Sequence, residues 1–191
     1  DLNVDGLSPG FSPISPTMFI TETFINEGDL VITGNGSINA FGEDPTFGIF
    51  NTSGAVLTLG GDPAGGDLII SGISPLVNDG TLIVTNSDTR GDSLISVQNG
   101  IENNNLLQIN AGTTLEVPFL SLNQGEIALN GGVLSLFDPM VPGGLVVDDG
   151  SSITGEGVIQ AQAGVFVEEG GRIAPGNSPG AILFDTDLSL F

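Results

Sequence analysis

The chain has 191 residues, of which 39% are hydrophobic, so its length suits one domain with a sizeable core and its composition is not that of a disordered chain. Its 23 acidic and 2 basic residues give a formal net charge of −21, which disfavours binding to nucleic acid and to anionic membrane surfaces. Cysteine, histidine and lysine are absent, which excludes disulfides, zinc sites built from Cys and His, and nucleophilic triads that need one of these residues.

The first seventeen residues differ in character from the rest of the chain. They are rich in Pro, Ser and Gly, and Pro9, Pro13 and Pro16 punctuate them, which predicts an extended segment. We therefore expect an N-terminal extension over 1–17 and one folded domain over 18–191. No apolar run approaches the ~20 residues that span a bilayer, so we expect no membrane insertion.

A candidate cation site lies at the start of this extension. The run D-L-N-V-D-G over residues 1–6 matches the first half of a calcium-binding loop, in which oxygen ligands alternate along the chain. Asp1, Asn3 and Asp5 are the candidate ligands for Ca²⁺, and we expect no other cofactor. Ser12 stands where such a loop has its bidentate Glu, so an ordinary acidic segment is the competing interpretation.

From Met18 onward, short apolar segments alternate with turns. Each segment has apolar residues at its first and third positions, and its middle residue is free to be polar. Side chains two apart point to the same face of a strand, so this period predicts β-strands with one buried face. The segments lie at 30–32, 82–84, 107–109, 115–117, 127–129 and 134–136. No segment keeps a 3.6-residue period, so the predicted class is all-β.

The turns before these strands recur with a polar-x-Gly signature, as in Asn26-Glu27-Gly28. Successive copies begin at positions 26, 51, 78, 103, 123, 148 and 168, of which those at 51 and 103 are looser copies. A unit of 20–27 residues is the size of one coil of a parallel β-helix. We expect Gly to supply a positive φ at each corner, and Asn side chains at equivalent corners to hydrogen-bond from coil to coil.

The predicted fold is therefore a parallel β-solenoid with coils of 20–27 residues. An antiparallel sandwich or barrel is the alternative, but the chain has no Trp or Tyr to fill a broad core, and its apolar pairs follow the turns in a consistent phase. The solenoid predicts a buried core at Leu82, Val84, Leu107, Ile109, Leu115, Val117, Ile127, Leu129, Leu134 and Leu136.

The most specific pattern lies in the last third of the chain. The run G-S-S-I-T-G-E-G-V-I over 150–159 is followed by G-G-R-I-A-P-G-N-S-P-G over 170–180. These runs resemble the repeats of autotransporter passenger domains and related bacterial surface β-helix proteins. The resemblance is strong over about 144–190, is one of general style over 24–143, and does not cover 1–17. It implies a secreted, surface-associated, right-handed parallel β-helix of a group that includes adhesins and structural proteins.

The run P-G-N-S-P-G over 175–180 also has a purely structural interpretation. Two prolines fix φ and two glycines allow sharp corners, so we expect a rigid turn between coils. Strands are expected to follow it over 181–184 and 188–190.

Carboxylate chemistry is the catalytic class that the composition leaves open. The pairs Asp148-Asp149 and Glu168-Glu169 are candidate acids of a polysaccharide hydrolase or lyase, with Arg172 as a charge stabiliser. Neighbouring strand residues point to opposite faces, so neither pair spans a cleft by itself. Asp148 and Glu168 share a repeat phase and are expected to stack one coil apart. A solvated acidic edge explains these residues better, and we expect the protein not to be an enzyme.

Both ends of the predicted solenoid are apolar rather than capped. Open coil ends invite strand pairing with another chain, and a contact between unlike ends propagates a filament. We expect residues 1–25 of one subunit to contact the C-terminal coils of the next; the alternative is that further segments cover both ends. The candidate assembly residues are Met18, Phe19, Ile20, Phe24, Ile182, Phe184, Leu188, Leu190 and Phe191.

These patterns together favour an extracellular structural or adhesive protein, a subunit of a cell-surface fibre or appendage that assembles head to tail. The expected partners are further copies of the chain and, as a second candidate, a surface glycan. The alternatives are a carboxylate-dependent polysaccharide hydrolase or lyase and a non-catalytic glycan-binding module.

Overall fold

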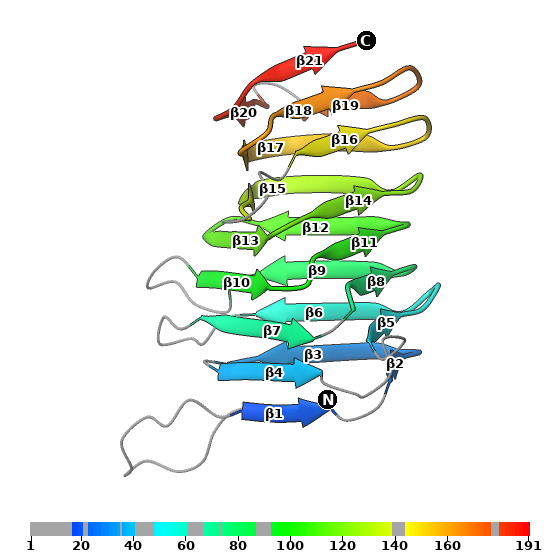
Figure 1. The fold of residues 1–191 in the computed structure, drawn as a ribbon, viewed down its shortest axis with the longest axis vertical. Helices are drawn as coiled ribbons and strands as arrows, with labels where there is room; N and C mark the ends of the chain where they lie inside the picture. The colour runs from blue at the N-terminus through cyan, green and yellow to red at the C-terminus, as the bar shows by residue number, and fades with distance from the viewer. Residues whose placement is uncertain are drawn as a thin grey trace.

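The chain winds as a right-handed helix of stacked parallel strands in the computed structural model (Figure 1). The structure describes residues 17–20, 23–34, 36–40, 48–60, 67–72, 74–86, 93–138, 144–176 and 180–191. These residues form 21 strands, all of whose pairings are parallel, and no helix. The predicted all-β parallel β-helix is confirmed. Within the described part of the chain, no helix is present that could cross a membrane.

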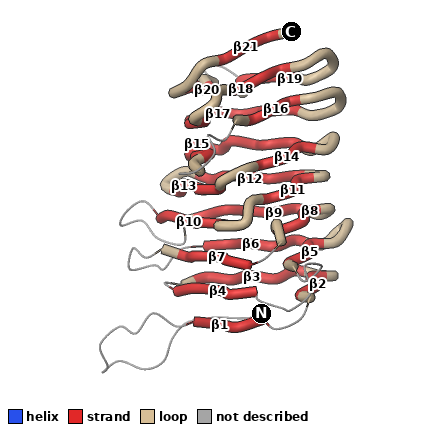
Figure 2. The backbone as a smooth tube through the Cα atoms, in the orientation of Figure 1, coloured by secondary structure: helices blue, strands red, loops and turns tan. Residues whose placement is uncertain are grey.

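Each coil passes over three faces in turn, and loops gather at the corners between them (Figure 2). The first face carries short strands of three residues. They are β2 (Phe24–Asn26), β5 (Ile49–Asn51), β8 (Leu76–Asn78), β11 (Ile101–Asn103), β14 (Leu120–Leu122), β16 (Leu145–Val147), β18 (Val165–Val167) and β21 (Leu188–Leu190).

The second and third faces form one large curled sheet. The second face holds β3 (Asp29–Thr33), β6 (Val56–Gly60), β9 (Thr81–Thr85), β12 (Leu106–Asn110) and β19 (Arg172–Pro175). The third face holds β1 (Thr17–Ile20), β4 (Gly36–Ala40), β7 (Leu68–Gly72), β10 (Ser93–Val97), β13 (Thr113–Val117) and β20 (Ile182–Phe184). Two long strands cover both faces, and these are β15 (Glu126–Leu136) and β17 (Ser152–Ala161).

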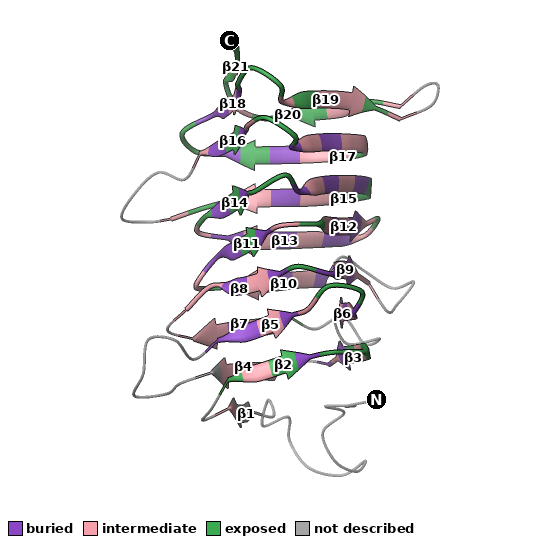
Figure 3. Ribbon diagram, turned by 90° about the vertical axis from the view of Figure 1, so that its right-hand side faces the viewer, coloured by how far each residue is buried: buried purple, intermediate pink, exposed green. Residues whose placement is uncertain are grey.

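The core consists of aliphatic columns in which each residue stacks on its equivalent in the next coil. Figure 3 shows the buried positions on the strands of successive coils. Leu57, Leu82 and Leu107 form one such column, and all three are 0% exposed. All ten residues of the predicted core are at most 1% exposed, so their predicted inward orientation is confirmed. Full burial of an aliphatic side chain contributes about 1.5–3 kcal/mol, so the columns are the main source of stability.

A ladder of buried asparagines closes the first face over four coils. Asn26, Asn51, Asn78 and Asn103 stand in register on β2, β5, β8 and β11. The Nδ2 of each of the first three donates to the Oδ1 of the next, over 2.8, 2.7 and 2.7 Å. The same Nδ2 groups also donate to backbone carbonyls of the second face. The expected coil-to-coil Asn bonds are therefore confirmed, and the ladder satisfies buried amides that would otherwise be costly.

Beyond this ladder, the predicted repeat phase is wrong by one residue. Asn103 pairs with Leu122, so Asn123 lies one position past the ladder and is exposed. In later coils Val147 and Val167 hold the ladder position, and the polar residue comes after them. The polar-x-Gly signature does not determine which residue occupies the ladder position, because the corners between the first and second faces differ in length. The signature can begin either at the ladder position or one residue after it.

The longer of these corners use glycine as predicted. Corners at 52–55, 148–151 and 168–171 are closed by the N–H of the fourth residue donating to the carbonyl of the first. Their third residues are Gly54, Gly150 and Gly170, with φ of 83°, 81° and 86°. A type II turn requires this positive φ at its third residue, so glycine is favoured there.

In the short corners, the prediction of a positive φ is wrong. Gly28 and Gly80 do not have a left-handed φ. Gly80 is glycine for another reason, since a Cβ would overlap the carbonyl oxygens of Thr52 and Ala55 in the preceding coil. At Gly28 a Cβ would meet nothing within 4 Å, and nothing in the structure requires glycine there.

The turn predicted between coils at 175–180 lies inside one coil instead. Its flanking strands β19 and β20 both pair with β17, so the turn joins the second and third faces of the same coil. The expectation was wrong because β17 crosses this corner as one continuous strand, while the next coil breaks into two strands at Pro175. The strands predicted to follow are β20 and β21; residues 177–179 lie outside the described residues.

Candidate functional site

The last coil presents the ends of two core columns without cover. Leu188 and Leu190 of β21 pair with Val165 and Val167, which are 0% and 8% exposed. Leu188 itself is 41% exposed and Leu190 is 71% exposed, because none of the described strands covers the outer side of β21 (Figure 1). Phe191 follows at 81%. This end is an apolar edge strand, a surface that readily pairs with another strand.

The third face ends at β20 in the same way. Ile182 and Phe184, two further predicted assembly residues, are half-buried and pack against the core. Between them, Leu183 points outward and is 60% exposed. Among the described strands β20 pairs only with β17, so it too is an edge strand.

At the opposite end, β1, β2 and β3 are the edge strands. Among the described strands, β1 pairs only with β4 and β2 only with β5. Ile20 and Phe24 are half-buried against the core, and Ile25 points outward with 55% of its surface exposed. The side chains of Met18 and Phe19, and all of residues 1–16, lie outside the described residues.

The two ends have matching steps. At the N-terminal end, the third face begins one coil earlier than the first face, because β1 precedes β2. At the C-terminal end, the first face runs one coil further than the third face, because β21 follows β20. If two copies stack along their axes, β21 of one meets β2 of the next at the same height at which β20 meets β1. The steps therefore match on the first and third faces, while β19 and β3 on the second face are left one strand position apart.

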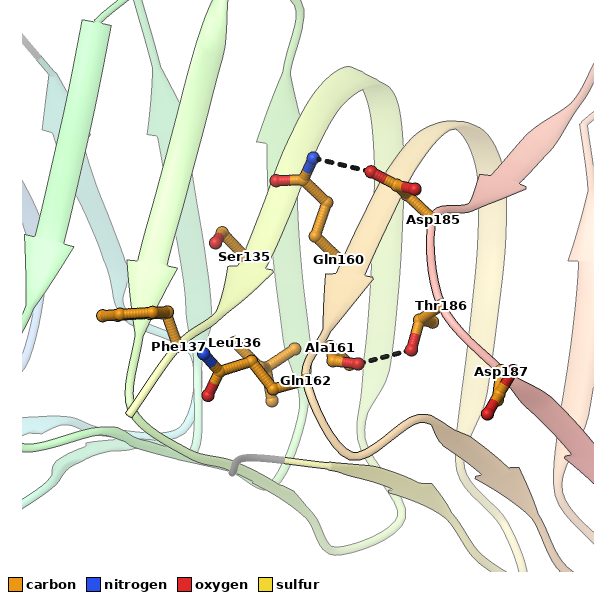
Figure 4. Close-up of a pocket in the computed structure, with 9 residues that line it drawn as sticks. All are labelled: Ser135, Leu136, Phe137, Gln160, Ala161, Gln162, Asp185, Thr186 and Asp187. Carbon is orange, nitrogen blue, oxygen red and sulfur yellow. Dashed lines mark hydrogen bonds between the residues drawn. The ribbon is translucent and has the colours of Figure 1, made fainter. Parts of the chain in front are cut away.

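A groove lies on the outer surface of the last coils. Its volume is about 620 Å³, and it crosses the corner that follows the third face in the last coils. Figure 4 shows its lining, in which six residues are polar and three, Leu136, Phe137 and Ala161, are apolar. The lining residues are Ser135, Leu136, Phe137, Gln160, Ala161, Gln162, Asp185, Thr186 and Asp187.

The carboxylates that the sequence offered as candidate acids lie elsewhere, at corners of the first face. Asp148 and Glu168 do occupy equivalent positions on successive coils, because Val147 pairs with Val167. Ser151 donates a hydrogen bond to Asp148 at 2.5 Å, which ties that carboxylate to its own turn. Asp149, Glu168 and Glu169 are exposed, as is Arg172, and none of them lines the groove. The candidate acids and Arg172 therefore lie at solvated corners.

The candidate Ca²⁺ ligands Asp1, Asn3 and Asp5 lie outside the described residues. Among the residues that the structure describes, no group of three acidic side chains is arranged to hold a metal ion. The calcium site therefore stays a prediction.

The groove was missed in the sequence because no motif marks it. Phe137, Gln162 and Asp187 are spaced by one coil each and share no residue type. Only the strand register brings them together. An alignment of the last three repeats in the correct phase could have revealed the groove.

Comparison with known proteins adds no assignment: no family model, curated protein or solved structure matches this chain.

Proposed function

We propose that the protein is an extracellular structural or adhesive subunit whose copies stack head to tail into a fibre. The observation that carries the proposal is the exposure of Leu188 and Leu190 in columns that are otherwise sealed. Burying a leucine contributes about 1.5–3 kcal/mol, so covering both side chains favours association. A second coil stacked on β21 would bury both.

The matching steps at the two ends support the same proposal. A contact between unlike ends repeats without closing unless a rotation happens to close it, so it builds a filament. Backbone pairing of β21 with β2 and of β20 with β1 would continue both sheets across the junction. Assignment to the cell surface rests on the resemblance of the runs at 150–159 and 170–180 to surface β-helix repeats.

The charge of the subunit opposes this assembly. With a net charge of −21, copies repel one another at low ionic strength. Salt at about 0.15 M shortens the screening length to about 8 Å, so the assembly experiment is run at that ionic strength or above.

Sedimentation velocity over a concentration series tests the proposal. The intact chain is expected to form species that grow with concentration, and the double variant Leu188→Asp/Leu190→Asp is expected to stay monomeric. Val146→Asp is the matched control, since Val146 is 44% exposed and points outward on β16, away from the proposed junction, and it is expected to assemble like the intact chain. An intact chain that stays monomeric at every concentration, or a double variant that assembles as well, contradicts the proposal.

A further inference from the structure

The groove is built from two outward columns that run along the axis of the helix. Ser135 and Gln160 pair in register on β15 and β17, and Asp185 is the next member, since it follows Phe184, the partner of Ile159. The second column, two residues further along each coil, holds Phe137, Gln162 and Asp187. Successive members of a column are separated by about 4.8 Å, the spacing of neighbouring strands.

Much of the hydrogen-bonding capacity of this lining is unused by the protein. Gln160 Nε2 donates to Asp185 Oδ2 at 3.3 Å, and the Thr186 hydroxyl donates to the carbonyl oxygen of Ala161 (Figure 4). Among the described residues, the side chains of Gln162 and Asp187 have no hydrogen-bond partner. The amide of Gln162 and the carboxylate of Asp187, on successive coils, are thus available to a ligand.

The chemistry of the lining restricts the class of ligand that the groove can bind. Two carboxylates and no basic side chain line the groove, so an anionic ligand is repelled. The polar majority of the lining disfavours a lipid or another apolar ligand. A neutral ligand rich in hydroxyl groups uses both kinds of lining group, because hydroxyls accept from amides and donate to carboxylates, whereas a cation would use the carboxylates alone.

Phe137 supplies a second feature of a site for hydroxyl-rich ligands, an exposed aromatic side chain. Its ring is 48% exposed at one end of the groove, and Gln162 extends toward it (Figure 4). An exposed aromatic face beside amides can cover the apolar C–H face of a sugar ring while the amides bond its hydroxyls. A volume of about 620 Å³ lies within the ordinary range of ligand sites.

We propose that this groove binds a neutral polysaccharide, laid along the axis over the last three coils. The columns run along the axis over three coils, so an extended chain of sugars contacts more of the lining than a single small molecule does. The proposal does not rest on head-to-tail assembly, because the outward columns are distinct from the inward Leu188 and Leu190 that assembly would cover.

The test is a titration of the full chain by calorimetry with neutral oligosaccharides of glucose, xylose and mannose and with acidic oligogalacturonate. At least one neutral series is expected to bind, more tightly as the oligosaccharide lengthens, while oligogalacturonate binds at least about tenfold more weakly. Phe137→Ala and Gln162→Ala are each expected to weaken binding by about tenfold, a loss of about 1.4 kcal/mol. Phe119→Ala is the matched control, since Phe119 is 42% exposed and lies outside the groove, and its binding is expected to be unchanged.

The double variant Leu188→Asp/Leu190→Asp separates this proposal from assembly, since it is expected to keep its affinity for the oligosaccharide as a monomer. Far-UV circular dichroism verifies that each variant is folded. The proposal is overturned if no neutral oligosaccharide binds, if the acidic one binds as well as the neutral ones, or if Phe137→Ala and Gln162→Ala bind like Phe119→Ala.

Discussion

Replacement of Asn78 by alanine tests whether the asparagine ladder stabilises the stack. Asn78 is 0% exposed and is bonded on both sides. Its Nδ2 donates to Asn103 Oδ1 at 2.7 Å and to the Leu106 carbonyl at 2.9 Å, and its Oδ1 accepts from Asn51 Nδ2 at 2.7 Å. The Asn78→Ala variant therefore loses three hydrogen bonds in one step.

The expected loss of stability follows from these contacts. Each bond contributes a net of about 1 kcal/mol, and the partners left in a buried corner add a desolvation penalty of about 1–3 kcal/mol. Asn51 Nδ2 keeps its bond to the Thr81 carbonyl, which limits the penalty on that side. We expect the free energy of unfolding to fall by about 3–5 kcal/mol.

Urea denaturation followed by far-UV circular dichroism measures this change, because the chain has no Trp or Tyr for fluorescence. Linear extrapolation gives the free energy of unfolding of each variant. Asn123→Ala is the matched control, since Asn123 is exposed and lies one position past the ladder, and its effect is expected to stay within about 0.5 kcal/mol. Equal losses in the two variants refute the assignment of a stabilising role to the ladder.

The remaining predictions concern the corners, the core and cations. Gly80→Ala is expected to destabilise the protein by about 1–3 kcal/mol, because the added methyl group overlaps the preceding coil. Gly28→Ala is expected to be neutral or to stabilise the protein by about 0.4–1 kcal/mol. Urea midpoints that fall equally in both variants contradict the argument that Gly80 is required by its close approach to the preceding coil. Leu115→Ala, at a position that is 0% exposed, is expected to cost about 2–5 kcal/mol in the same assay, and a change below about 1 kcal/mol counts against the column model. Millimolar Ca²⁺ is expected to raise the melting temperature relative to chelator, since the chain carries a charge of −21 and the 1–6 loop; superimposable melting curves count against a bound cation.

The core could be predicted from the sequence because it depends only on local alternation. Each strand carries its own apolar pair, as Leu115 and Val117 do, and the pair fixes the inward face without any knowledge of the neighbours. The asparagine ladder followed from the same kind of observation, since the Asn residues that begin successive turns in the first half of the chain are spaced by a nearly constant interval.

The repeat phase of the later coils could not be predicted from local alternation of residues. Asn123 fits the turn signature as well as Asn103 does, but register places Leu122 in the ladder column. The difference comes from the length of the corner between the first and second faces, which varies from coil to coil. The groove depends on the same register, because its columns join residues that lie one coil apart, such as Phe137 and Gln162.

A cysteine pair placed across the two ends tests head-to-tail stacking most directly. Ile25 and Ser189 are the outward middle residues of β2 and β21, and the chain has no other cysteine. If copies stack in register, Ile25→Cys of one copy lies beside Ser189→Cys of the next, at the Cα separation of neighbouring strands, which a disulfide can span. The account predicts that the double variant, oxidised under mild conditions, gives a ladder of disulfide-linked multimers on a non-reducing gel, while each single variant stops at a dimer. A double variant that yields only monomers and dimers, or a ladder of equal intensity from a control pair of Ile25→Cys with the mid-stack Ser121→Cys, would contradict it.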